Sequence, residues 1–264
     1  MQDAVLNSTP LFYVRDVPVY GDTILAPMDG YSDWPFRSIC RALGSAMSYT
    51  EFVKVEKILS RSKEPAKRLY YEEAERPITF QIYGDDPELL LKAALKIEPL
   101  QPDIIDINMG CPAKSIADRG AGVGMMPTPL KIARTFRKLV KNLRVPVTGK
   151  IRLGWDRNKN YKLIARIVEE EGGSLIAVHG RTKEQRYTGS SDWDAIAANL
   201  AHAVVRPVMR QVRDAIVHVV TRHCALPRAC VRNAPPRERE CARARARARR
   251  PARSKQARGT ASAA

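Results

Sequence analysis

Asn108-Met109-Gly110-Cys111-Pro112 is the segment around which the rest of the chain is organised. The β-branched run 103–107 precedes it and predicts a short strand that is buried and hydrophobic on both faces. A cysteine just past a strand end, on a turn bounded by glycine and proline, is typical of a residue that faces a cleft. A free cysteine is otherwise most often an ordinary buried apolar residue. The pentapeptide alone does not separate these two interpretations, so the neighbouring motifs must.

Strands and helices alternate on both sides of this segment. We expect strands at 23–28, 46–51, 77–84, 103–107, 146–153 and 174–178, and helices at 33–43, 86–98, 128–140, 159–171 and 193–200. This rhythm is typical of βαβ units and a parallel sheet, in either a doubly wound fold or a (β/α)8 TIM-type barrel. The absence of Gly-x-Gly-x-x-Gly after the first strand disfavours a dinucleotide-binding fold. We therefore predict the α/β class and a barrel of about six βα units, incomplete at its C-terminal side.

Polar or reactive side chains recur at the C-terminal ends of five predicted strands. They are Met28 with Asp29, Gln81, Asn108 to Cys111, Lys150 with Arg152, and His179 to Thr182. In a barrel these strand ends form one rim, where the active site lies, so we expect a single composite site. Each group also has an ordinary interpretation, because an amide can satisfy backbone groups, a lysine can reach solvent and a histidine can be structural.

Four motifs occur in a fixed order along the chain. They are Ala26-Pro27-Met28-Asp29-Gly30, Asn108-x-Gly-Cys111-Pro112, Lys150-Ile-Arg152-Leu-Gly-Trp155 and His179-Gly-Arg-Thr182-Lys-Glu-Gln-x-Tyr187, followed by Asp192-Trp193. Over roughly residues 22–200 the chain thereby resembles the tRNA-dihydrouridine synthase family. The resemblance implies a cytoplasmic barrel enzyme that uses FMN, with NADPH as reductant, to reduce selected uridines of tRNA to dihydrouridine.

The same resemblance implies roles for individual residues. Cys111 would be the catalytic acid, and Arg152 and Arg181 would contact the substrate base or phosphates. Contacts to FMN would come from Pro27, Met28, Asp29, Gln81, Asn108, Lys150 and His179. The chemistry suits a cysteine, because hydride addition at C6 of uracil requires a proton at C5 and an ordinary thiol, with a pKa of about 8.5, is protonated at neutral pH. The uridine must leave its stack to reach the site.

The chain changes character after about residue 200. Residues 201–264 contain fifteen Arg and one Lys against three acidic residues, which accounts for thirteen of the seventeen net positive charges. We predict a catalytic barrel domain over 1–200 and a disordered Arg/Ala/Pro-rich tail over 201–264. A seventh strand could begin at 204–209, but the Asn-Gly-Asp and Gly-Arg-Gly segments expected from the family for the FMN phosphate are missing. The bias of the tail resembles out-of-frame translation of GC-rich sequence.

Several other classes of function are disfavoured by the sequence. No apolar run is long enough for a membrane span, and five cysteines without a Cys-x-x-Cys pair are typical of a reducing cytoplasm. His218, His223, Cys224 and Cys230 match no standard metal spacing. Two alternatives remain beside the leading one: a flavin barrel that acts on free pyrimidines or enones, which the cysteine motif disfavours, and a non-catalytic basic RNA-binding protein on a decayed barrel scaffold.

Overall fold

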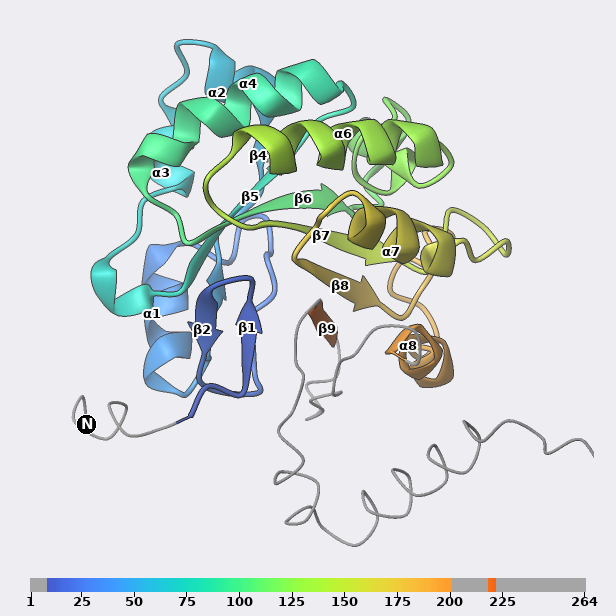
Figure 1. Ribbon diagram of the computed structural model, residues 1–264, viewed down its shortest axis with the longest axis horizontal. Helices are drawn as coiled ribbons and strands as arrows, with labels where there is room; N and C mark the ends of the chain where they lie inside the picture. The colour runs from blue at the N-terminus through green and yellow to red at the C-terminus, as the bar shows by residue number, and fades with distance from the viewer. Residues whose placement is uncertain (1–8, 201–217, 222–264) are drawn as a thin grey trace, which may run out of the picture. The chain divides into compact units, whose positions relative to one another are not determined.

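The computed structural model describes residues 9–200 and 218–221, all within one compact unit. Its main sheet has the strand order β3-β5-β6-β7-β8-β9, with β4 also paired to β5. Strands β3 to β8 are parallel to their neighbours, whereas β9 is antiparallel to β8. The sheet is curled, and helices α4, α6 and α7 lie along its outer face (Figure 1). The α/β class and the incomplete barrel are therefore confirmed.

The elements are short and follow one another closely. The strands are β1 (Phe12–Val14), β2 (Val17–Val19), β3 (Ser48–Tyr49), β4 (Val53–Lys54), β5 (Ile78–Tyr83), β6 (Ile104–Met109), β7 (Val147–Arg152), β8 (Leu175–His179) and β9 (His218–Thr221). The helices are α1 (Trp34–Ala42), α2 (Val55–Leu59), α3 (Glu64–Arg68), α4 (Pro87–Ile97), α5 (Lys114–Ala117), α6 (Pro129–Asn142), α7 (Tyr161–Glu170) and α8 (Trp193–Leu200). Three 3-10 turns cover 73–75, 98–100 and 122–125.

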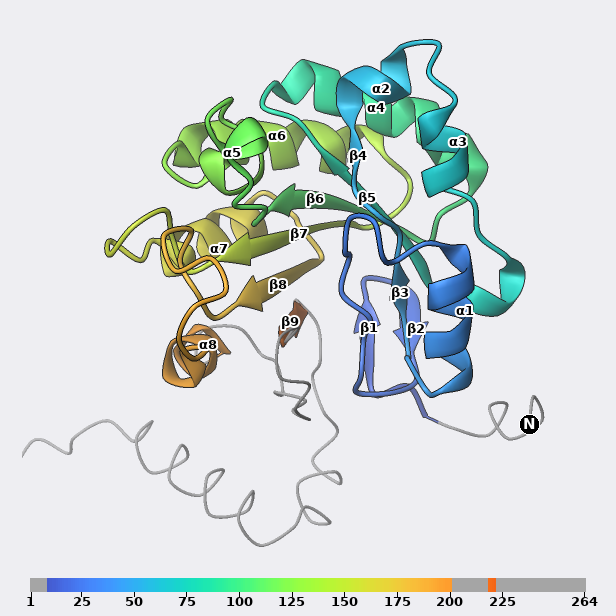
Figure 2. The same cartoon turned by 180° about the vertical axis from the view of Figure 1, so that it is seen from behind.

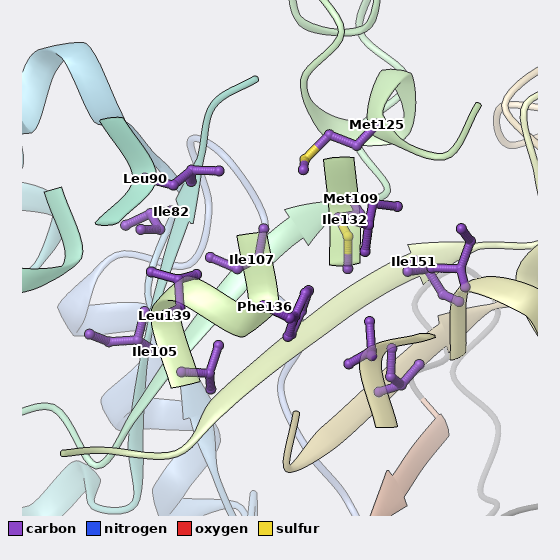
Figure 3. Packing of buried hydrophobic residues seen from close by; sticks show 14 of the residues in the cluster. Ile82, Leu90, Ile105, Ile107, Met109, Met125, Ile132, Phe136, Leu139 and Ile151 are labelled. Carbon is purple, nitrogen blue, oxygen red and sulfur yellow. The ribbon is translucent and has the colours of Figure 1, made fainter. Parts of the chain in front are cut away.

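The larger hydrophobic core lies between the outer face of the sheet and the helices. Alternate residues of β6, Ile105, Ile107 and Met109, point outward into it and meet Phe136 of α6 (Figure 3). Gly149 of β7 allows this close approach, since a Cβ there would lie 2.6 Å from the Met109 side chain and 3.0 Å from the Phe136 ring. The period of two along each strand therefore sends the aliphatic residues to the helices.

The inner face of the sheet changes from apolar to polar along the strands. Near the N-terminal ends of the strands, Tyr49, Ile104 and Leu175 form a second buried cluster. Toward the C-terminal ends the inward positions are polar, because Asp106 and Asn108 alternate with the outward aliphatic residues of β6. The expectation that this strand is hydrophobic on both faces is wrong for its inner face, although the whole strand is buried.

A β-hairpin that the sequence did not predict closes the apolar end of the barrel. Strands β1 and β2 pair antiparallel around residues 15–16, and Arg15 has φ +58°. Val14 and Val19 are fully buried in the same cluster as Ile104 and Leu175, and Figure 2 shows the hairpin from the opposite side. The hairpin therefore fills the bottom of the barrel, leaving the opposite end for polar groups.

The first two strands differ from the sequence prediction. The segment 23–28 forms only a single parallel bridge, between Ile24 and Met47. It does not extend into a strand because the proline at 27 lacks an N–H. The next carbonyl, that of Met28, accepts instead from the N–H groups of Tyr31 and Ser32 in a turn. The predicted strand 46–51 is reduced to β3 and is followed by the short strand β4. The later strands and the five predicted helices are confirmed to within about three residues at their ends.

Helix α1 faces the protein with its charged side. Asp33 caps it, accepting from the Phe36 N–H at 3.2 Å. Arg37, fully buried, donates to Glu75 of the neighbouring 3-10 turn at 2.7 and 3.2 Å. Ile39 and Leu43 lie on the other side and are 60% and 83% exposed. The usual arrangement of an amphipathic helix is therefore reversed here.

The predicted boundary at residue 200 stays a prediction. Of the tail 201–264, the structure describes only the four residues of β9, which pair with β8. The remainder of the tail, including the possible strand at 204–209 and the residues His223, Cys224 and Cys230, lies outside the described residues.

Candidate active site

The C-terminal ends of β6, β7 and β8 point to the same side of the sheet (Figure 2). Register places Asn108 opposite Lys150 and Arg152 opposite His179 on adjacent strands. Because residues two apart on a strand share a face, Lys150 and Arg152 both project from the inner side of β7. Four of the residues predicted from the sequence are thus neighbours at one rim.

The turn that carries Cys111 is held by Asn108. The Asn108 Oδ1 accepts from the N–H groups of Gly110 at 3.1 Å and Cys111 at 2.9 Å. Its Nδ2 donates to Gln81 Oε1 at 2.9 Å, which joins β6 to β5. The Cys111 carbonyl in turn accepts from the N–H of Val123 at 3.1 Å. Gln81, Asn108 and Cys111 therefore form one connected unit.

The Cys111 thiol is partly buried beside two cations. Burial raises the pKa of this thiol, and nearby Asp29 also raises it, whereas Arg152 and Lys150 lower it. The net direction is upward, so the thiol is protonated at neutral pH. Gly122 packs directly behind it with φ +55°, and a Cβ at that position would lie 2.8 Å from the Cys111 carbonyl oxygen. The site therefore presents a thiol acid and not a thiolate nucleophile.

Lys150 is a half-buried cation whose ammonium has no hydrogen-bonded counter-ion within the described part of the chain. Burial lowers the pKa of its ammonium to about 8; Arg152 lowers it further, while Asp106 and Cys111 oppose the shift. Among the residues that the structure describes, its Nζ forms no hydrogen bond and no ion pair. Burying a charge without partners is costly, so a group with acceptor atoms fits this position.

His179 is held as a neutral imidazole. Burial lowers its pKa to about 2, and the cations Lys150, Arg152 and Arg181 act in the same direction. The Nη1 of Arg181 lies 3.4 Å from His179 Nε2. Because a guanidinium can only donate, this hydrogen bond makes Nε2 the acceptor and assigns the proton to Nδ1. The ring can therefore donate from Nδ1.

Arg152 fastens the Cys111 turn to the loop after β8. Its Nε donates to the Gly110 carbonyl at 2.9 Å, and its Nη1 donates to the carbonyls of Thr182 at 2.9 Å and Arg186 at 2.7 Å. The guanidinium also lies 5.5 Å from the centre of the Tyr187 ring. The residue is 2% exposed, so most of its donors are used within the protein.

We expect Arg152→Lys to lower the free energy of unfolding by about 2 kcal/mol, because a single ammonium cannot reach the carbonyls that the planar guanidinium reaches. Urea denaturation would measure the loss, and proteolysis of the 182–189 loop should become faster. The exposed Arg157 on the preceding loop offers the control Arg157→Lys, which should change stability by less than about 0.5 kcal/mol. Equal stability of the two variants would contradict the fastening role.

The remaining predicted residues lie on the loops around the rim. Arg181 donates through Nη2 to the Gly189 carbonyl at 2.8 Å, and its buried Nε has no hydrogen-bond partner in the described part of the chain. Asp29 pairs with Arg68, which also lies 3.4 Å from Glu51. The half-buried Pro27 and Met28 precede Asp29 in the same turn.

Sequence reasoning missed two parts of this site. The carboxylate of Asp106 is fully buried and accepts from Gln81 and Thr148, one residue from each neighbouring strand. Its signal was present, because a lone aspartate inside the aliphatic run 104–107 is rarely buried without a partner. The pair of Arg68 with Asp29 had no such signal, since α3 is too short to show periodicity.

The fold and the rim together define an incomplete (β/α)8 barrel whose reactive groups gather at the C-terminal ends of its strands. The family model described as "Dihydrouridine synthase (Dus)" matches residues 24–209. The chain therefore belongs to the dihydrouridine synthase family.

Named relatives support the same conclusion. The chain is 42% identical over 186 residues to "tRNA-dihydrouridine synthase B" of Pseudomonas aeruginosa, covering 70% of this chain and 56% of that protein. It is 38% identical over 183 residues to "Probable tRNA-dihydrouridine synthase" of Aquifex aeolicus, covering 67% of this chain and 56% of that protein. The chain spans about half the length of the curated relatives it matches.

Two further observations concern the described part of the chain alone. None of its helices combines the length and apolar character that crossing a membrane requires. No group of three or more His, Cys, Asp or Glu side chains within residues 9–200 and 218–221 is arranged to hold a metal ion.

Proposed function

We propose that this chain carries the FMN-binding catalytic part of a tRNA-dihydrouridine synthase, over residues 1–200. The observation that carries the proposal is that five groups meet on one rim of the barrel. They are a protonated thiol, an ammonium that no described residue pairs with, two linked amides and a neutral imidazole. These groups come from strands β5 to β8 and from the turn after β6. The reductant would be NADPH, the partner tRNA, and the compartment the cytoplasm. Residues 201–264 would form a tail outside this domain.

The residues present fit a flavin. The buried Lys150 ammonium has no hydrogen-bonded acceptor among the described residues, and the pyrimidine part of a flavin is rich in acceptors. Gln81, Asn108 and His179 lie beside it as donors or acceptors, and Pro27, Met28 and Asp29 complete the rim. When bound, FMN would supply hydride to C6 of the uracil ring.

Cys111 would supply the proton that the reaction requires at C5. Its raised pKa keeps the thiol protonated at neutral pH, and Asn108 fixes the turn that presents it. Lys150 and Arg152, both near the sulfur, would stabilise the thiolate left after transfer. A uridine in folded tRNA must be extruded to reach this position. Arg152 and Arg181 would contact it through the N–H groups that bind no backbone carbonyl.

We expect Lys150→Met to weaken FMN binding by at least about 10-fold while stabilising the flavin-free protein by about 2 kcal/mol at pH 7. The folded protein holds the ammonium at a pKa of about 8, below its value in the unfolded chain. The wild type should therefore gain stability as pH rises from about 8 to 10, where the unfolded chain still binds the proton.

Flavin titration and urea unfolding across this pH range would measure both effects. Lys162→Met is the control, because Lys162 is exposed on α7 and should change neither quantity appreciably. A Lys150→Met protein that binds FMN normally would contradict the proposed flavin contact.

The whole proposal is tested with the purified chain and unmodified tRNA. Flavin absorbance at about 450 nm and tRNA-dependent oxidation of NADPH are expected. A colourless protein that binds tRNA with a steep salt dependence would instead favour the non-catalytic RNA-binding alternative.

A further inference from the structure

A continuous hydrogen-bond chain begins at the buried carboxylate of Asp106. Its Oδ1 accepts from the Thr148 hydroxyl at 2.6 Å, and its Oδ2 accepts from Gln81 Nε2 at 2.7 Å. Thr148 is on β7 and Gln81 is on β5, so the carboxylate of the central strand β6 joins both neighbours. All three residues are fully buried on the inner face of the sheet.

The hydrogen-bond chain continues from Gln81 to the turn that carries Cys111. Gln81 Oε1 accepts from Asn108 Nδ2 at 2.9 Å, and Asn108 Oδ1 accepts from the backbone N–H groups of Gly110 and Cys111. Every donor in this series points from the turn toward Asp106. The path runs from a carboxylate deep in the barrel to the residue that bears the thiol.

The groups at the two ends of this hydrogen-bond chain determine its direction, that is, which side chain donates and which accepts in each bond. An ionised carboxylate only accepts, so Gln81 must turn its NH2 toward Asp106 and its oxygen toward Asn108. A backbone N–H only donates, so Asn108 must turn its oxygen toward Cys111 and its NH2 toward Gln81. These two requirements agree only if position 106 is an acceptor. A side-chain amide at 106 can donate as well as accept, and Gln81 could then reverse. The NH2 group of Gln81 would then face that of Asn108, so Asn108 could keep either its bond to Gln81 or its bonds to the turn.

We propose that Asp106 is the positioning residue for Cys111: its carboxylate fixes the orientation of the Gln81 and Asn108 amides, and through them the turn that holds the thiol. The relevance to catalysis rests on the proposed function, whereas the effect on the turn does not. Lys150 on the adjacent strand β7 acts on Asp106, and Tyr49 on β3, two strands away, responds to it; these are its titratable neighbours. Burial raises the Asp106 pKa to about 6, so the carboxylate is mostly ionised at pH 7 and the direction is set there.

Two variants distinguish an effect of Asp106 on the direction of the hydrogen bonds from an effect on side-chain packing. Asp106→Asn keeps the volume of the side chain but removes the acceptor-only end. The double variant Asp106→Asn, Gln81→Glu moves the carboxylate, which can only accept, from position 106 to position 81. There it can accept from the amide at position 106 on one side and from Asn108 on the other. Thr148→Val is the matched control, because it removes a hydrogen bond to the same carboxylate and leaves the direction unchanged.

Hydrogen–deuterium exchange of peptides that cover residues 108–112 reads the turn in the flavin-free chain. Alkylation of Cys111, relative to Cys40 on α1 of the same molecule, gives a second reading. We expect Asp106→Asn to speed exchange at Gly110 and Cys111 by about 10-fold or more and to change the alkylation rate. The double variant should return both to within about 3-fold of the wild type, and Thr148→Val should stay near the wild type.

Exchange at the wild-type rate in Asp106→Asn would overturn the proposal. The proposal would also be overturned if the exchange rate of the double variant were no closer to the wild-type rate than that of Asp106→Asn. If Asp106 acted only through packing, Gln81→Glu would not restore the rate. If Asp106→Asn fails to fold, a folded double variant with wild-type exchange supports the proposal, and failure of both variants overturns it. None of these measurements needs turnover, so they stand apart from the test of tRNA reduction.

Discussion

Replacing Cys111 by alanine is expected to lower the rate of tRNA reduction by at least about 100-fold, the range that a positioned general acid supplies. The thiol is partly buried near Asp29, Lys150 and Arg152, and burial, which raises its pKa, keeps it protonated. Alanine removes the proton donor and leaves Asn108, Lys150 and the turn in place. The flavin content and the fold should therefore remain as in the wild type.

Single-turnover reduction of unmodified tRNA by the flavin-loaded protein would measure this loss. Cys40→Ala is the matched control, because Cys40 is a second free thiol, on α1, with no part in the rim. Its rate should equal that of the wild type. Reduction by Cys111→Ala at the wild-type rate would remove this residue from the proposed role.

The second large effect concerns the ion pair beneath α1. Arg37→Met is expected to lower the free energy of unfolding by about 3–5 kcal/mol, because it leaves the Glu75 carboxylate buried without its cation. Arg37 also donates to the carbonyls of Ser32 at 2.9 Å and Tyr70 at 2.7 Å, so three parts of the chain lose a common partner.

Urea denaturation of single and double variants would measure this effect. Arg37→Met with Glu75→Gln should recover a large share of the loss, since no unpaired charge then remains. The exposed pair of Arg166 and Glu170 on α7 gives the contrast, and Arg166→Met should cost less than about 0.5 kcal/mol. Equal costs for Arg37→Met and Arg166→Met would show that burial does not strengthen the first pair.

The sequence predicted the parts of the fold in which a long element has a clear period. Helix α6 and strands β5 to β8 are such elements, and proline or glycine marks several of their ends. The hairpin β1–β2 and helices α2 and α3 were missed because runs of three to five residues carry too little periodicity.

The residues of the candidate site also fall into those that could be predicted from the sequence and those that could not. Gln81, Asn108, Cys111, Lys150 and His179 could be predicted as neighbours because strand ends in a parallel barrel meet. The contacts of Arg152 could not, since its partners are backbone carbonyls, which every residue carries and which therefore leave no signal in the sequence. The partners of Asp106, Gln81 and Thr148, could not be predicted either, because the inner face of a strand is known only once the barrel curvature is known.

The burial of the Cys111 thiol has a consequence for resistance to oxidants. Peroxides react with the thiolate form of cysteine, and the raised pKa keeps that form scarce at neutral pH. A cysteine that acts as an acid can thus avoid the sulfenic and sulfinic products that inactivate enzymes with thiolate nucleophiles. The environment that raises the pKa of the Cys111 thiol, and so keeps the proton that the proposed acid role requires, therefore also slows its reaction with peroxides.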